Sequence, residues 1–135
     1  MENEAVNKVQ PPNDTLSEQA VIGSMLVSKD AVQTAVEVLK PEDFYREDNK
    51  IIYSAILNLY NRAEPIDIIT LKSELQAMGD FEKVGGLEYL AELPEKVPTT
   101  ANVEKYINIV EEKYALRSLI KTANEINNLL LIKYL

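Results

Sequence analysis

The sequence predicts an all-α protein, and two features lead to that prediction. Apolar residues recur at every third or fourth position along most of the chain, which is the spacing of one helix face. Only four Gly and six Pro occur among 135 residues, which leaves little room for a turn-rich all-β fold. No segment alternates convincingly between apolar and polar residues. We therefore expect a compact helical head of five to six helices, followed by a long helix or a helical hairpin.

Residues 1–14 are predicted to form a flexible arm. They are polar, and Pro11 and Pro12 favour extended backbone. The globular head is expected to cover residues 15–97 and to open with a helix, because Thr15-Leu16-Ser17-Glu18 has the form of a capping box. The apolar face expected for this first helix includes Leu16, Ala20, Val21, Met25 and Leu26.

Two further helices are expected between residues 30 and 62. Asp30 is a suitable N-cap for the first of them, and Pro41 ends it. The next helix runs from about Asp48 to about Arg62, and its wide apolar stripe predicts that it is the central core helix. That stripe consists of Ile51, Ile52, Ala55, Ile56, Leu59 and Tyr60.

Two short helices complete the predicted head. Thr70 is expected to cap a helix that ends at Gly79, which stands where a glycine terminates a helix. Another helix is expected over residues 86–93, after which Pro94 and Pro98 bound a connector. The side chains predicted to share one side of that helix are Leu87, Leu90 and Leu93.

Residues 98–135 are predicted to form a helical extension that starts near Thr99 or Thr100. Its apolar positions follow one register over the first part and another over the second. The first register comprises Val103, Ile107, Val110 and Tyr114, and the second comprises Leu116, Leu119, Ile120, Ala123 and Ile126. A stripe that rotates in this way favours a bend or two helices in a hairpin.

Composition excludes several classes of function. A net charge of −8 makes the chain a poor candidate for binding nucleic acid by itself. The absence of His and Cys excludes disulfides, thiolate or imidazole metal sites and every mechanism that needs those groups. No glycine-rich phosphate loop can be drawn from four glycines, and no apolar run is long enough to span a membrane. We expect no cofactor and no metal in this fragment.

Two alternatives remain open at this point. One is a small acidic helical enzyme, a metal-dependent hydrolase that uses carboxylates alone, with Glu42 and Asp43 or Glu111 and Glu112 as the nearest acid pairs. The other is a helix-turn-helix DNA reader over residues 15–40, whose second helix lacks Arg and favours core packing instead.

The extension also carries the composition of a protein interface. Tyr106, Tyr114 and Arg117 combine aromatic rings with a guanidinium, as interaction hot spots do, although the pattern favours hairpin core for both tyrosines. Residues 129–132 and 134–135 are apolar on all faces, which a free monomer should not expose to water. We expect this end to pack in an oligomer, unless the chain is a piece of a longer protein or its tail is altered.

Several short motifs occur in a fixed order between residues 11 and 127. They are Pro11-Pro12-Asn13, Glu18-Gln19-Ala20-Val21-Ile22-Gly23 with Leu26, Pro41-Glu42-Asp43-Phe44-Tyr45-Arg46, Glu64-Pro65-Ile66-Asp67 before Thr70-Leu71, Gly85-Gly86-Leu87 with Tyr89-Leu90, Val97-Pro98-Thr99-Thr100-Ala101-Asn102-Val103-Glu104-Lys105-Tyr106, Ile109-Val110-Glu111-Glu112-Lys113 and Leu116-Arg117. As an ordered set they resemble the amino-terminal domain of the bacterial replicative DNA helicase, the DnaB family. The tail from about Asn128 departs from the more polar second hairpin helix of that family.

The resemblance implies a collar domain without catalysis of its own. In the family, hairpins pair between neighbours to give a dimer, a trimer of dimers or a hexamer, and the collar receives the carboxy-terminal domain of primase. A helicase loader is a further possible partner. The ATPase motor that binds ATP and Mg lies in a carboxy-terminal domain absent here, and the parent helicase would work in the bacterial cytoplasm at the replication fork. The resemblance gives candidate residues for primase binding or hairpin pairing, namely Tyr89, Tyr106, Tyr114, Arg117, Ile120 and Ile126.

Overall fold

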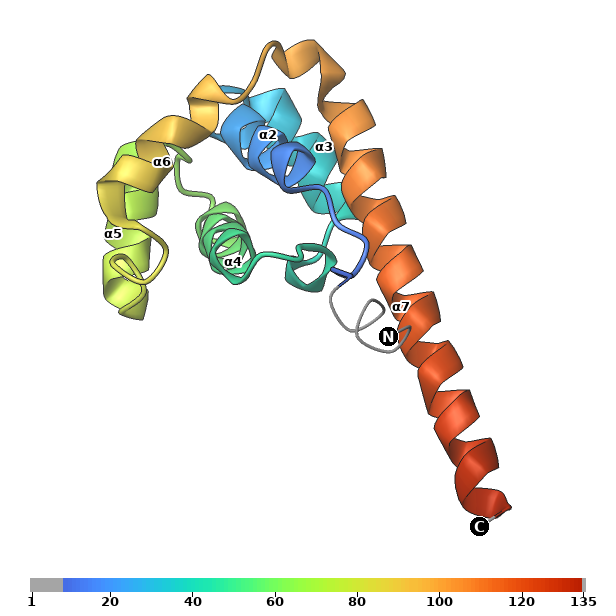
Figure 1. Cartoon of the computed structure of the whole chain (residues 1–135). Coiled ribbons are helices and arrows are strands. Elements are labelled where there is room, and N and C mark those ends of the chain that lie inside the picture. The colour runs from blue at the N-terminus through green and yellow to red at the C-terminus, as the bar shows by residue number, and fades with distance from the viewer. Residues whose placement is uncertain (1–8, 135) are drawn as a thin grey trace.

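The computed structural model describes residues 9–134, and every regular element in that range is helical. The elements, in chain order, are α2 (Thr15–Val27), α3 (Lys29–Val38), the 3₁₀ turn η1 (Pro41–Asp43), α4 (Glu47–Asn61), α5 (Ile68–Met78), α6 (Gly86–Glu95), the 3₁₀ turn η2 (Thr100–Asn102) and α7 (Val103–Lys133). Figure 1 places α5 and α6 on one side of the α2–α3 pair and α7 on the other. The predicted all-α fold is confirmed.

Helix α2 begins at Thr15 as predicted, but the predicted capping residue is wrong for three helices, because the actual cap lies one to three residues earlier. Asp14 Oδ1 accepts from Ser17 N at 2.9 Å and caps α2, so Thr15 is already inside the helix. Ser28, not Asp30, caps α3. Helix α5 is capped by Asp67, whose side chain accepts from the backbone N of Thr70, while Thr70 Oγ1 in turn accepts from Asp67 N at 3.0 Å. In each case a short polar side chain accepts from one of the first free backbone N–H groups of the helix.

The core lies between α2, α4 and the inner faces of the helices around them. Helix α4 is the central helix that the sequence predicts, with Ile52, Tyr53 and Ile56 fully buried. Helix α2 crosses α6 so closely that a Cβ on Gly23 would lie 2.2 Å from the carbonyl oxygen of Leu93. Only glycine fits this crossing, which therefore fixes the two helices against each other.

Four predictions about the head are wrong in detail. Leu16, Tyr60 and Leu87 were expected on buried faces, but 69%, 36% and 48% of their surfaces are exposed. Pro94 lies inside α6 rather than in a connector after it. Gly79 does end α5 in the left-handed conformation, at φ 78°, as predicted.

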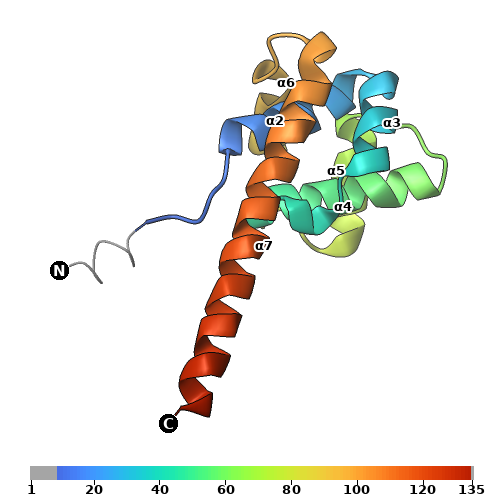
Figure 2. The ribbon, with the colours of Figure 1, turned by 90° about the vertical axis from the view of Figure 1, so that its right-hand side faces the viewer.

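Of the two forms predicted for the extension, the long helix is confirmed, and the bend or hairpin is wrong for the described residues. Helix α7 is one continuous helix of 31 residues. Its first half packs against α2 and α3 and buries Val103, Ile107 and Val110 in the core. Its second half continues past the head, as Figures 1 and 2 show from two directions. No helix in residues 9–134 is both long and apolar enough to cross a membrane.

Candidate partner-binding surface on the long helix

The second half of α7 presents an exposed apolar surface, which we call the distal stripe. Its members recur at spacings of three and four residues, so they share one face of the helix. They are Leu116, Leu119, Ile120, Ala123, Ile126 and Leu130. The exposed fractions of Leu119, Ile120 and Ile126 are 66%, 49% and 54%. Apolar surface of this extent on one face is typical of an interaction site.

The distal stripe faces away from the head. At the helical repeat of 3.6 residues per turn, it lies on roughly the opposite side of α7 from Ile107 and Val110, which pack against the head. The rotation of the apolar register noted in the sequence is thus a change of face along a continuous helix. A partner that covers the stripe has to approach from outside, where the head does not obstruct it.

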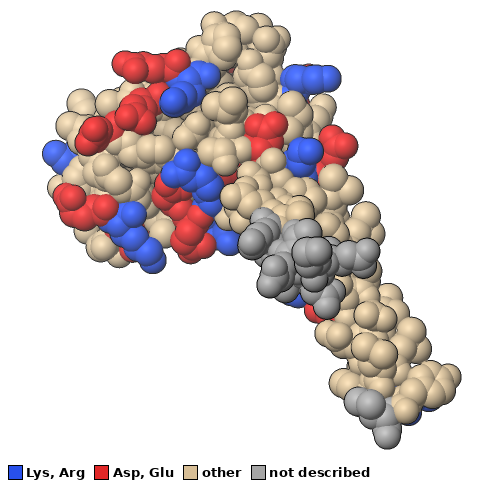
Figure 3. Space-filling model, viewed as in Figure 1, with Lys and Arg blue, Asp and Glu red and all other residues tan. Residues whose placement is uncertain are grey.

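The six residues of the distal stripe carry no charge, and neither do Ala115, Thr122, Asn127 and Leu129 beside them. Charged residues lie beyond the two ends of the stripe, at Glu112 and Lys133. In the view of Figure 3, charged side chains of both signs are spread over the head, whereas the projecting end of α7 is mostly uncharged. An uncharged face wider than a two-stranded seam is suited to packing against more than one helix.

Arg117 and Tyr114, two of the predicted contact residues, are engaged within the molecule. Arg117 Nη1 donates to the carbonyl oxygen of Pro12 at 2.8 Å, and Nη2 donates to that of Asp43 at 2.9 Å. The guanidinium carbon also lies 5.4 Å from the ring centroid of Tyr45 and 5.7 Å from that of Tyr114. Neither side chain is presented freely to a partner.

Tyr89 and Tyr106, two further predicted contacts, are half-buried. The Tyr89 hydroxyl donates to Asn49 Oδ1 at 2.6 Å and accepts from Gln19 Nε2 at 3.2 Å. Burial raises the pKa of Tyr89 above its ordinary value of 10.0. Tyr106 packs against the core from the first half of α7. Ile120 and Ile126 are therefore the predicted residues that the structure places together on the open surface.

A buried polar network, which the sequence did not suggest, holds Tyr89 in place. Glu18 is only 2% exposed, and its carboxylate accepts from the backbone N of Tyr45 at 2.7 Å and from Asn49 Nδ2 at 3.0 Å. Glu18 thus binds the start of α4 rather than closing the capping box of its own helix. The hydrogen-bond partners of Glu18 lie 27 and 31 positions away in the sequence, so a local pattern does not reveal this network.

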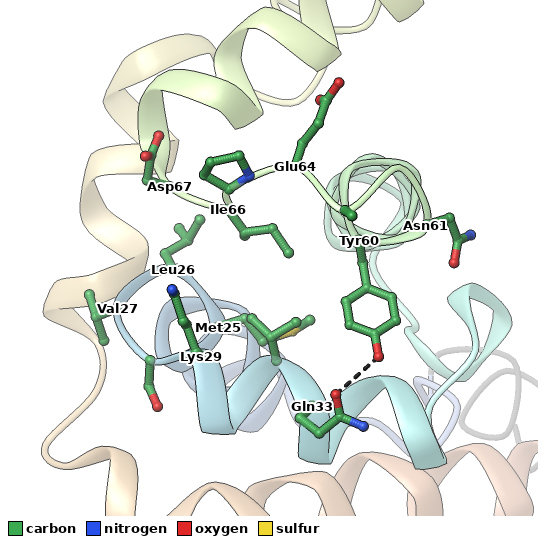
Figure 4. A pocket seen from close by; sticks show the side chains of 14 residues that line it. Met25, Leu26, Val27, Lys29, Gln33, Tyr60, Asn61, Glu64, Ile66 and Asp67 are labelled. Carbon is green, nitrogen blue, oxygen red and sulfur yellow. Dashed lines mark hydrogen bonds between the residues drawn. The ribbon is translucent and has the colours of Figure 1, made fainter.

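A groove on the head is a second surface that the sequence did not indicate. It has a volume of about 940 Å³ and lies where the ends of α2 and α4 meet the start of α3. Figure 4 shows Met25, Leu26 and Ile66 toward its floor, with Tyr60 at the side, hydrogen-bonded to Gln33 at 3.0 Å. Lys29, Glu64 and Asp67 also line the groove, so it combines an apolar floor with a mixed polar rim.

The acid pairs considered for a metal-dependent enzyme are not arranged as metal ligands in the described part of the chain. Asp43 Oδ2 accepts from Lys40 N at 2.7 Å, and burial raises the pKa of its carboxyl. Glu42, Glu111 and Glu112 are exposed. Nowhere in residues 9–134 do three or more acidic side chains gather as ligands for a metal ion. Helix α3, the recognition helix of the helix-turn-helix alternative, buries Ala31, Val32 and Ala35 in the core.

The fold defines a class of domain, namely a compact helical head that carries one long projecting helix. The chain belongs to the DnaB-like helicase N-terminal domain family, whose model matches residues 10–112. The match covers the head and the first ten residues of α7, and it ends before the distal stripe.

Known relatives and solved structures agree with this assignment. The chain is 47% identical over 119 residues to the replicative DNA helicase DnaB of Leifsonia xyli, and 46% identical over 121 residues to the replicative DNA helicase DnaC of Bacillus subtilis. These matches cover 88% and 90% of this chain but only 26% and 27% of the relatives. The chain therefore spans about a quarter of the length of these proteins.

Among solved structures, the N-terminal domain of DnaB helicase from Mycobacterium tuberculosis is similar with a TM-score of 0.86 and 44% identity, covering 88% of this chain and 85% of that one. A DnaB-like replicative helicase, described together with its interactions with primase, is similar with a TM-score of 0.76 and 25% identity. The match covers 88% of this chain and 28% of that helicase.

Proposed function

We propose that this chain is the amino-terminal collar of a bacterial replicative DNA helicase, and that it acts as an assembly and primase-docking module. The observation that carries the proposal is the distal stripe on α7, an exposed and uncharged apolar face on a domain of the DnaB family. The domain has no catalytic step of its own in this proposal. The parent helicase would bind ATP and Mg in a further domain and work in the cytoplasm at the replication fork.

The first function of the stripe is self-association, as a dimer, a trimer of dimers or a hexamer. Complete burial of a Leu or Ile side chain contributes roughly 1.5–3 kcal/mol. Leu119, Ile120 and Ile126 retain about half or more of their exposed surface, so a second copy that covers them would gain a large part of that contribution. The stripe points away from the head, so two copies can pair along α7 with their heads on the outside.

The second function is to receive the carboxy-terminal domain of primase, with a helicase loader as a further possible partner. The solved DnaB-like helicase described with its primase interactions supports this choice of partner. Of the residues predicted to contact a partner, Ile120 and Ile126 are the accessible ones, and they lie on the same face. Tyr89, Tyr106, Tyr114 and Arg117 are already engaged by contacts within the chain, so Ile120 and Ile126 are the residues that we propose contact the partner.

Calorimetric titration with the carboxy-terminal domain of the cognate primase, with light scattering on each sample, tests the proposal. Saturable binding to an oligomer is the expected result, and Ile120→Asp should lower the affinity or the oligomer size, because it places a carboxylate on the apolar stripe. The matched control is Ile69→Asp, since Ile69 is 80% exposed on α5, on the other side of the head.

The outcomes separate the two functions. An Ile120→Asp variant with unchanged affinity and oligomer size would exclude Ile120 from both interfaces. A well-folded oligomer that does not bind primase would move primase docking elsewhere and leave self-association standing. Equal losses in Ile69→Asp and Ile120→Asp would show that the effect is not specific to the stripe.

A further inference from the structure

Arg117 lies where three segments of the chain meet. It belongs to α7, at the point where the helix leaves the head, and its two terminal nitrogens donate to carbonyl oxygens on two other segments. Pro12 belongs to the segment before α2, and Asp43 belongs to η1. The bonds therefore connect residues that are 105 and 74 positions apart in the sequence.

The surroundings of Arg117 fix its side chain on several sides. The rings of Tyr45 and Tyr114 both lie within reach of a cation–π contact, at 5.4 and 5.7 Å from the guanidinium carbon. The hydrogen bonds of 2.8 and 2.9 Å use both arms of the planar fork at once. A lysine carries the same charge on a single ammonium group. It lacks the planar fork that donates to both carbonyl oxygens while the guanidinium contacts both rings.

Both acceptors are main-chain carbonyl oxygens, so Arg117 positions the backbone at Pro12 and at Asp43. The carbonyl of Asp43 belongs to a residue that is 7% exposed, and the Asp43 side chain itself closes η1 by accepting from Lys40 N. The anchor on the head is therefore rigid. Pro12, by contrast, belongs to the segment before the Asp14 cap of α2. The hydrogen bond from Arg117 connects this segment to a residue far away in the sequence.

We propose that Arg117 is a joint that couples the path of the N-terminal segment to the direction in which α7 leaves the head. While both carbonyls are bound, α7 and the segment at Pro12 are held against the same rigid point at Asp43. When the guanidinium is removed, both are released together. The inference concerns the single chain and does not depend on the identity of any partner.

The absence of Cys from the chain allows a direct test by paired spin labels. One pair, at Asn61→Cys and Asn128→Cys, reports the direction of the projecting part of α7 relative to the head. A second pair, at Asn61→Cys and Val9→Cys, reports the path of the N-terminal segment. All three positions are exposed, and labelled chains are diluted with an excess of unlabelled chain so that only distances within one molecule are measured.

The expected result is that Arg117→Ala broadens and shifts both distance distributions, while the matched control Lys121→Ala, one turn further along α7 and exposed, leaves both unchanged. Arg117→Lys keeps the charge and should broaden both distributions as well, because the fork is lost. This second variant keeps the proposal testable if Arg117→Ala fails to fold, and circular dichroism confirms helix content in each case.

Two outcomes would overturn the proposal. If both distributions in folded Arg117→Ala or Arg117→Lys match the wild type, Arg117 does not hold either segment. If only one of the two distributions changes, the segments are not coupled through Arg117.

Discussion

The two halves of α7 belong to one helix but differ in what surrounds them. The first half, from Val103 to about Arg117, packs against the head and contributes Ile107 and Val110 to the core. The second half projects beyond the head and exposes Ile126 and Leu130. Both halves are equally helical, so continuity of the backbone does not show where the domain ends.

The helical conformation of the two halves is stabilised by different contacts. Isolated helices are marginal in water, and most helix stability in proteins comes from packing of an apolar face. The first half has that packing within its own chain. The second half has an apolar face of similar kind and no partner for it among residues 9–134, so we expect its stability to depend on association.

The largest effect is expected from removing the same side chain from each half. Ile107→Ala deletes a side chain that is 2% exposed and should lower the free energy of unfolding by about 2–5 kcal/mol. Ile126→Ala deletes one that is 54% exposed and should change it by less than about 0.5 kcal/mol in dilute solution. Urea unfolding at low protein concentration measures both, and equal losses would contradict the comparison.

The next effect concerns local opening along the helix. Amide hydrogen exchange between Glu104 and Tyr114 should require an opening free energy close to that of global unfolding, whereas amides beyond Leu119 should exchange through local fraying. Exchange detected by mass spectrometry on peptides from each half measures this. Raising the protein concentration should slow exchange in the second half alone, and uniform protection at low concentration would refute the distinction.

The smallest effect concerns pH at the contact between the head and the first half of α7. Burial raises the pKa of the Asp43 carboxyl above its ordinary value of 3.8, and the nearby charges of Glu42 and Glu111 act in the same direction. The folded state therefore binds this proton more tightly than the unfolded state does. The contribution to stability is complete below pH 3.8 and is lost as the pH rises through the pKa of the folded state.

Thermal unfolding of the wild type and Asp43→Asn across acidic to neutral pH tests this expectation. The variant should lack the part of the pH dependence of stability that comes from Asp43. The difference in melting temperature between wild type and variant should therefore change as the pH rises from 3.8 through the pKa of Asp43 in the folded state. Asp30→Asn is the control, because Asp30 is exposed on α3. If the difference in melting temperature between wild type and Asp43→Asn is the same at every pH, titration of Asp43 does not contribute to the pH dependence of stability.

The sequence predicted the fold class, the central helix α4 and the glycine at the end of α5 because local periodicity and backbone conformation determine them. It assigned the helix caps to Thr15, Asp30 and Thr70 instead of Asp14, Ser28 and Asp67, because several adjacent polar residues could serve as caps. Which one does so depends on the direction from which the chain enters the helix, and local spacing does not contain that direction.

The candidate site was harder to predict, and the reasons are physical. The change of apolar register near Arg117 suggested a hairpin, but the same pattern results when two halves of a straight helix face different surroundings. Glu18 and Arg117 have partners far away in the sequence, so their roles depend on the tertiary fold. The helical spacing of Ile120 and Ile126 is a local signal and the fold leaves that face uncovered, while their role in binding a partner stays a prediction.

The uninterrupted helix α7 also has a mechanical consequence. At a rise of 1.5 Å per residue, the part beyond Arg117 is a stiff lever of about 25 Å, and a tilt of about 10° at its base displaces the tip by about 4 Å. The fulcrum lies at the edge of the head, where α7 passes η1. Small adjustments there are therefore amplified along the helix into movements large enough to shift the contacts of the distal stripe.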